Sequence, residues 1–152
     1  MKNNLITLQA KDHVENTPGF LLWQTEMCWQ RIANHTLASF DLTYTQFIVL
    51  RISDNLNQNS DTVYQHQVAK FSRIDRMMTS RILASLEKKN FIEREKLRGD
   101  ARAKLVVLTS KGESVLNKSH QALTEAENAF FKHGSDNFVK FMQSILTSCA
   151  TS

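Results

Sequence analysis

The chain has 152 residues, of which 41% are hydrophobic and 22% are charged, and its formal net charge at pH 7 is +4. This length and composition suit one compact domain with its own core, so we expect a single domain over residues 1–152. No stretch approaches the roughly 20 apolar residues that span a bilayer, and the N-terminal residues lack the apolar region of a signal peptide, which predicts a cytoplasmic protein without membrane contact.

The first half of the chain predicts long helices, because it contains few helix breakers. Thr17 and Pro18 place an N-cap before a proline at the first helical position, and residues 20–37 are apolar at helical spacing. Residues 43–46 (Thr-Tyr-Thr-Gln) fit a capping box, in which the threonine and glutamine side chains satisfy free backbone N–H groups. A second helix is therefore expected from there to about Asn55.

Two shorter helices follow, separated by a turn. The first begins near Thr62 or Tyr64, and the side chains that we expect it to bury are Val68, Ala69 and Phe71. Residues 72–74 form the turn, and Asp75 is a natural N-cap for the next helix. In that helix the core-facing positions recur at i, i+3, i+4 and i+7 and are Thr79, Ile82, Leu83 and Leu86.

The opposite face of this fourth helix combines cationic, hydroxyl and apolar groups that suit base edges and phosphates. Its members are Arg76, Met78, Ser80, Arg81 and Ser85. An ordinary solvated helix face is the alternative interpretation of the same pattern.

The last third of the chain predicts a hairpin and two helices. Residues 91–97 and 103–108 are strand-like, and the basic, glycine-containing segment 97–104 forms the tip between them. Ser110 and Glu113 fit a capping box for a helix over residues 111–131. A final helix is expected from Ser135 to about Leu146.

The order of these elements predicts a mostly α protein with about six helices and a small β-hairpin, which is a winged helix-turn-helix. In such a scaffold the second helix of the pair fits the major groove of DNA, and the tip of the hairpin reaches toward a minor groove. The charge distribution agrees, because residues 70–104 hold 11 Lys and Arg against 5 Asp and Glu, whereas the rest of the chain holds 8 against 10. A clustered basic surface is expected for phosphate contacts, although charge alone is a weak signal.

Groups for catalysis or metal binding are sparse. Cys28 and Cys149 form no C-x-x-C pair, and we expect both thiols to be buried as small apolar groups. The five histidines show no H-E-x-x-H spacing, and there is no glycine-rich phosphate loop. The sequence therefore predicts no enzyme, no metal site and no cofactor.

Three segments carry a resemblance to a known family. They are residues 67–69 (Gln-Val-Ala), residues 74–94 from Ile-Asp-Arg to Ile-x-Arg, and the wing Asp100-x-Arg102 followed by Leu108-Thr109-x-x-Gly112. Together they closely resemble the MarR (multiple antibiotic resistance regulator) family of bacterial and archaeal transcription factors. The similarity extends over nearly the whole chain, because the long first helix and the two C-terminal helices are also in the family's order.

The resemblance implies a homodimer and a double-stranded DNA partner. Helices at about residues 17–40 and 110–150 would interdigitate between the subunits, and the winged helix-turn-helix would occupy about residues 43–109. Two such units match a palindromic operator. The usual outcome in the family is repression, with release of the DNA by a small effector that is often aromatic or phenolic, although activation stays open.

The resemblance also assigns roles to individual residues. The positions that enter the major groove are Arg76, Met78, Ser80 and Arg81. Arg102 occupies the wing position that is inserted into the minor groove, and Asp100 either pairs with an arginine or bonds its own backbone in the turn. The residues expected to contact phosphates are Lys88, Arg98 and Lys104.

An effector cleft between the dimerisation helices and the DNA-binding part is also implied. The residues that could line it are Trp23, Met27, Trp29 and Phe47, although large apolar residues at helical spacing more often form the core or an interface.

Two departures from the family pattern are noted. Asn90 stands where glycine is usual and is expected to adopt the left-handed conformation. Gly19 aligns with the reactive cysteine of the peroxide-sensing branch, so thiol sensing would have to use Cys28, more than two turns later. The alternatives to an effector-controlled repressor are therefore a redox-sensing regulator through Cys28 and a winged helix that binds another protein.

Overall fold

The computed structural model describes residues 13–132 and 135–150. These residues form six α-helices and one antiparallel hairpin, as predicted. In chain order the elements are η1 (Val14–Asn16), α1 (Pro18–Leu37), η2 (Ala38–Phe40), α2 (Tyr44–Asn59), α3 (Gln65–Ser72), α4 (Arg76–Lys88), β1 (Ile92–Leu97), β2 (Asp100–Leu108), α5 (Ser110–Phe130) and α6 (Ser135–Ala150).

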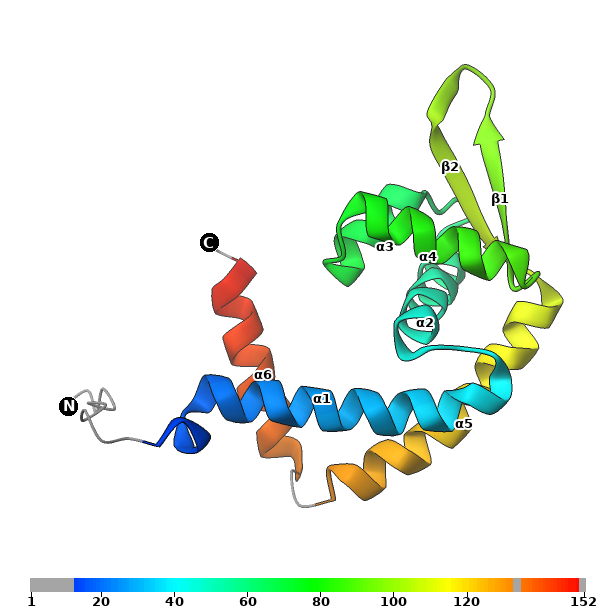
Figure 1. The fold of residues 1–152 in the computed structure, drawn as a ribbon. Helices are drawn as coiled ribbons and strands as arrows, with labels where there is room; N and C mark the ends of the chain where they lie inside the picture. Colours follow the sequence, from blue (N-terminus) through cyan, green and yellow to red (C-terminus); the bar gives the residue numbers. More distant parts are fainter. Residues whose placement is uncertain (1–12, 133–134, 151–152) are drawn as a thin grey trace.

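The helices fall into two groups (Figure 1). Helices α2, α3 and α4 and the hairpin form one lobe, from which the hairpin projects. Helices α1 and α5 pack against each other and, with α6, form the other lobe. The fully buried side chains lie mainly in the first lobe and at its junction with α1 and α5, and the largest are Leu37, Leu50, Leu83, Leu86, Ile92 and Leu116.

Most of the helix starts that were predicted for the first half of the chain are confirmed. The capping box at α2 is present, since the Gln46 backbone N–H donates to Thr43 Oγ1 at 3.2 Å and the Thr43 N–H donates to Gln46 Oε1 at 3.1 Å. Helix α2 continues to Asn59, about one turn beyond the predicted end. Thr17 is the N-cap of α1, but its hydroxyl donates to the Val14 carbonyl at 2.8 Å and does not bond the helix.

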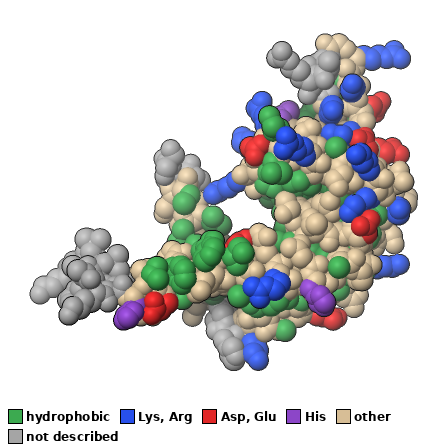
Figure 2. All heavy atoms as spheres, in the orientation of Figure 1, with side chains coloured by type: hydrophobic (Ala, Val, Ile, Leu, Met, Phe, Trp, Pro, Cys, Tyr) green, Lys and Arg blue, Asp and Glu red, His purple; other side chains and the backbone are tan. Residues whose placement is uncertain are grey.

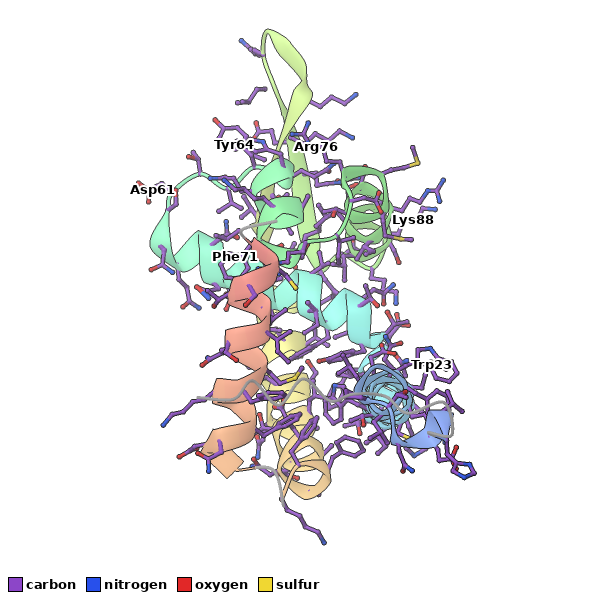
Figure 3. The ribbon with its side chains drawn as sticks, turned by 90° about the vertical axis from the view of Figure 1, so that its left-hand side faces the viewer. Trp23, Asp61, Tyr64, Phe71, Arg76 and Lys88 are labelled. Carbon is purple, nitrogen blue, oxygen red and sulfur yellow. The ribbon has the colours of Figure 1, made fainter. Side chains whose placement is uncertain are left out.

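The predicted burial of Phe71 is wrong. Val68 and Ala69 are buried as expected, but Phe71 in the last turn of α3 is 61% exposed. Its position in Figure 3 is at the end of α3 that faces α6, where Arg73 NH2 donates to the Leu146 carbonyl at 3.4 Å. At about 100° per residue, Phe71 lies off the side of α3 that Val68 and Ala69 bury, at the C-terminal end of the helix.

The hairpin is longer and more tightly closed than predicted. Its register runs from Ile92↔Leu108 to Leu97↔Asp100, with an irregularity next to Leu97. The connection is therefore reduced to two residues, of which Gly99 has φ +96°, a value that favours glycine.

The sequence analysis did not foresee a third segment beside the hairpin. The Val106 N–H donates to the Val63 carbonyl at 2.8 Å, and Tyr64 forms a bridge to Leu105. The segment before α3 therefore fixes β2 to the helical part of the lobe.

The start of α5 corrects one prediction and explains one motif. The N-cap is Thr109, whose Oγ1 accepts from the Gly112 N–H at 3.0 Å, so the predicted capping box at Ser110 is wrong. The Thr109 hydroxyl also donates to the Asn90 carbonyl at 2.6 Å. A Cβ at Gly112 would lie 1.9 Å from the Phe91 carbonyl oxygen, so only glycine fits there.

Helix α6 is the least packed element. It runs to Ala150, four residues beyond the predicted end, and none of its described residues is buried. Many of its large apolar side chains are exposed, among them Phe138, Val139, Phe141, Ile145 and Leu146. Across the described residues, no helix is long and apolar enough to cross a membrane.

Candidate nucleic-acid interface

Helix α4 begins at a well-defined cap. The turn before it places Arg73 in the left-handed region (φ 57°), and Asp75 then accepts a hydrogen bond from the Met78 N–H at 2.9 Å. The Thr79 hydroxyl donates to the Asp75 carbonyl at 2.9 Å from the buried side of the helix. The predicted turn and N-cap are thus confirmed, and the first turn of α4 has a fixed orientation.

The buried side of α4 determines which side faces solvent. Its buried residues are Thr79, Ile82, Leu83 and Leu86, as predicted. At about 100° per residue, the positions most nearly opposite this stripe recur at i, i+4, i+7 and i+11. They are Met77, Arg81, Ala84 and Lys88, which we call the α4 ridge.

The remaining predicted residues of α4 lie on its two flanks. Arg76 is exposed, and Ser80 is half-buried on the same flank, where its carbonyl accepts from Arg94 NH1 at 3.5 Å. Met78 is 46% exposed on the other flank. Ser85 is half-buried there and accepts from Gln46 Nε2 at 2.8 Å, so its hydroxyl joins α4 to α2 and does not point to open solvent.

A buried arginine connects α4 to the hairpin. Arg94 in β1 donates to Glu87 Oε2 through NH2 at 2.7 Å and through Nε at 3.1 Å, and through NH1 to Gln65 Oε1 at 3.2 Å. The Arg94 side chain is 10% exposed and that of Glu87 is 39% exposed. These hydrogen bonds hold the pKa of Glu87 below its ordinary value, although partial burial of the carboxyl opposes the shift.

The C-terminal end of α4 is attached to two other helices. Lys89 Nζ donates to the Asp41 carbonyl at 2.6 Å and to Gln46 Oε1 at 3.1 Å, which connects it to the segment before α2 and to the first turn of α2. Lys111 Nζ in α5 donates to the Lys89 carbonyl at 3.1 Å. Asn90 has φ 60°, so it adopts the predicted left-handed conformation. None of these contacts was anticipated from the sequence, because they join residues that are far apart in the chain.

Basic side chains gather around α4 and the hairpin (Figure 2). Arg98 at the tip is exposed, and Lys104, opposite Lys96 in the register, is half-buried. Arg76 and Lys88, both labelled in Figure 3, are the first and last residues of α4. The side chains of Asp100 and Arg102 are outside the described part of the structure, so their predicted roles stay predictions.

The four predicted effector residues do not line one cleft in this chain. Trp29 is 7% exposed and packs edge-on to Tyr44, with ring centroids 5.7 Å apart. Phe47 is 4% exposed and stacks on His120. Trp23 and Met27 are 58% and 48% exposed on α1, where they line an open depression of about 550 Å³.

Phe47 does contribute to a smaller cavity of about 140 Å³ between α2 and α5. Its other lining residues combine rings with groups that can form hydrogen bonds, and they are Tyr44, Ile48, Arg51, His120, Leu123, Thr124 and Glu127. Of the four predicted residues, only Phe47 therefore contributes to this cavity, whose volume is below that of a pocket for a drug-sized ligand and close to that of a cavity that accepts a single benzene ring.

The cysteines differ from expectation. Cys28 and Cys149 are both exposed, so the prediction that they are buried is wrong. Cys28 lines the same depression on α1 as Trp23 and Arg31. Within the described ranges, no group of three or more His, Cys, Asp or Glu residues is arranged to hold a metal ion.

Comparison with known proteins agrees with this geometry. The family model of the MarR family matches residues 42–104, which span α2 to the first half of β2. Over 132 residues the chain is 38% identical to an uncharacterized HTH-type transcriptional regulator, YdcH, of Bacillus subtilis (strain 168), and the match covers 86% of this chain and 90% of that protein.

Solved structures share the fold. CouR from Rhodococcus jostii RHA1, bound to p-coumaroyl-CoA, has a TM-score of 0.77 at 22% identity and is matched over 91% of this chain and 95% of that one. A mutant MarR from E.coli, complexed with operator DNA, has a TM-score of 0.74 at 23% identity, with 91% and 99% covered. The chain belongs to the MarR family of transcriptional regulators.

Proposed function

We propose that this regulator is a homodimeric repressor that binds a palindromic operator and is released by a small aromatic effector. The observation that carries the proposal is the α4 ridge, which presents Arg81 and Lys88 on a helix that is capped by Asp75 at its N-terminus and bonded to the segment before α2 through Lys89 at its C-terminal end. A cationic helix in a fixed orientation is what insertion into a major groove requires. Its resemblance in fold to a MarR protein complexed with operator DNA supports the same conclusion.

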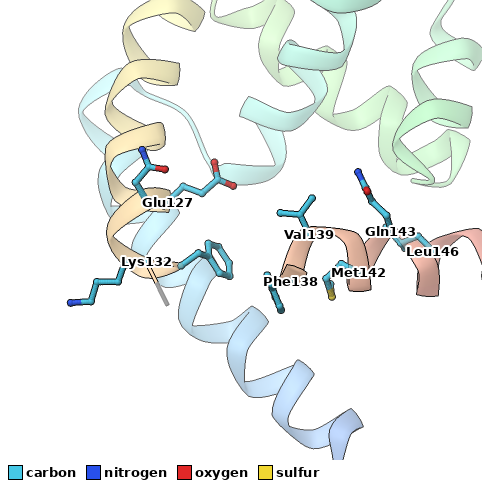
Figure 4. A pocket seen from close by; sticks show the side chains of 9 residues that line it. Glu127, Lys132, Phe138, Val139, Met142, Gln143 and Leu146 are labelled. Carbon is cyan, nitrogen blue, oxygen red and sulfur yellow. The ribbon is translucent and has the colours of Figure 1, made fainter. Parts of the chain in front are cut away.

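Dimerisation is supported by the exposed apolar surface of α6. In Figure 4, Phe138, Val139, Met142 and Leu146 of α6 line a pocket of about 560 Å³ together with residues from the end of α5. A contiguous apolar surface of this kind on a monomer indicates an interaction site. A second copy of the chain would cover it and place two α4 ridges on one face of the dimer.

The effector is proposed to occupy the cavity that Phe47 and His120 line between α2 and α5. Helix α2 is connected to α4 through Gln46, which bonds both Ser85 and Lys89. A ligand that separates α2 from α5 would therefore change the position of α4, provided that it binds the released state more tightly than the DNA-bound state.

The test is selection of bound sequences from a random double-stranded DNA pool, followed by titration with salt. We expect an inverted repeat with half-sites about one helical turn apart, and a log affinity that falls by about 0.9 per phosphate contact per log unit of salt. Arg102→Ala should weaken operator binding by about 1 to 3 kcal/mol if the wing enters a groove. Failure to enrich any sequence, or an affinity insensitive to salt, would favour a winged helix that binds another protein.

Thiol sensing is retained as a second candidate because Cys28 is exposed and lines a depression that Arg31 also lines. Peroxide should then release the operator from the wild-type protein and leave Cys28→Ser bound. Equal release from both proteins would eliminate this candidate.

A further inference from the structure

The most exposed large apolar side chain of the described residues lies within the basic surface. Met77 is 67% exposed, more than any other large hydrophobic residue, and it occupies the first position of the α4 ridge. Arg81 follows it one turn later, and Ala84 keeps the next position small. The apolar group is thus placed in line with the cations and not at the edge of the surface.

Its neighbour has a different environment. Met78 is 46% exposed and lies about 100° around the helix, on the flank that also carries Ser85, which bonds to α2. The two adjacent methionines therefore differ in direction although they share their chemistry. Met77 points away from the buried stripe of α4, so packing within this lobe does not explain an apolar residue at this position.

The chemistry of the major groove supplies an apolar partner. Thymine alone among the four bases presents a methyl group there, whereas the other base edges offer hydrogen-bond donors and acceptors. Methionine is unbranched and flexible, so its thioether can follow the position of such a methyl group. Arg81, one turn along the ridge, is placed to bond a neighbouring base edge or phosphate.

We propose that Met77 is a specificity-determining residue that packs against the 5-methyl group of a thymine in each operator half-site. The proposal rests on the proposed function, because it requires that α4 enters the major groove of operator DNA. Beyond the proposed function, it names the base and the chemical group that α4 contacts.

The experiment replaces each thymine of the selected half-site in turn by deoxyuridine, which lacks only the methyl group. Binding to both DNAs is measured for the wild type, Met77→Ala and Met78→Ala, and the deciding quantity is the ratio of the two dissociation constants of each protein, so a general loss of affinity in either variant does not affect the comparison. Loss of one buried methyl contact should weaken binding of the wild type by about fourfold at one thymine position. We expect Met77→Ala to bind the two DNAs equally, and Met78→Ala to retain the fourfold difference.

The outcomes distinguish the role of Met77 from operator binding itself. If the wild type selects an operator but no deoxyuridine substitution weakens its binding, or if Met77→Ala retains the penalty, the role of Met77 is refuted while operator binding stands. If Met78→Ala, and not Met77→Ala, loses the penalty for deoxyuridine, the role of Met77 is also refuted. If the wild type selects no DNA sequence, the proposed function itself is overturned. Both methionines are exposed, so circular dichroism of the variants should match that of the wild type.

Discussion

The contact between Glu87 and Arg94 gives a prediction whose size can be worked out from the structure. Arg94→Met keeps most of the volume of the side chain but removes every side-chain hydrogen bond to Glu87, Gln65 and the Ser80 carbonyl, and leaves only the bond from the residue 94 backbone N–H to Glu87 Oε1. Charged hydrogen bonds contribute about 1.5 to 3 kcal/mol each when their partners are left buried. Because the Glu87 side chain is 39% exposed and can be rehydrated, we expect a smaller total loss of about 2 kcal/mol.

The assay is urea unfolding followed by circular dichroism at one fixed protein concentration, since dimerisation would otherwise shift the transition. With a slope of about 1 to 3 kcal/mol per molar urea, the midpoint of Arg94→Met should fall by roughly 1 M. An unchanged midpoint would show that the side-chain contact contributes nothing to stability and would contradict this prediction.

The same contact predicts a dependence on pH, tested with Glu87→Gln. The pKa of Glu87 is lowered in the folded protein, so its charge stabilises the fold above the ordinary value of 4.5, and this contribution disappears as the pH falls through the lowered value. The difference in unfolding free energy between wild type and Glu87→Gln should therefore be largest at about pH 7 and should become smaller at acidic pH. A difference that is constant with pH would contradict this assignment of the charge.

Three further predictions concern the fold and the assembly. Gly112→Ala should destabilise the protein by about 1 to 3 kcal/mol or more, because the added Cβ would meet the Phe91 carbonyl. The control Gly19→Ala has open space around the added Cβ and should raise or preserve the melting temperature. Asp75→Ala should cost about 1 kcal/mol of unfolding free energy through loss of the α4 cap, measured by the same urea titration, and a cost near zero would contradict the capping geometry. In analytical ultracentrifugation, Phe141→Asp on α6 should shift the sedimenting species toward the monomer. Val107→Asp, at a similarly exposed site on the hairpin, should leave the protein dimeric. A dimeric Phe141→Asp would exclude α6 from the interface.

Local signals were sufficient to predict the helix starts at Thr43 and Asp75, because in each cap a side-chain oxygen accepts from a backbone N–H three residues later. They failed at α5, where Thr109 and Ser110 both offer a hydroxyl before a helical run. Thr109 is selected by a distant partner, since its hydroxyl also reaches the Asn90 carbonyl. The same limitation explains Phe71, whose apolar character was visible in the sequence but whose position beyond the core was not.

The solvent-facing side of α4 shows most clearly what periodicity can and cannot determine. The four buried positions were predicted correctly, and they define the solvent-facing ridge by helical geometry alone. The flanks are decided by contacts between distant parts of the chain, such as Gln46 with Ser85 across 39 positions and Arg94 with the Ser80 carbonyl across 14. Polar residue type therefore favoured Ser80 and Ser85 as contacts to bases. In the structure the Ser85 hydroxyl bonds Gln46 of α2 and Ser80 is half-buried, whereas Met77 is exposed on the ridge that would meet a base pair.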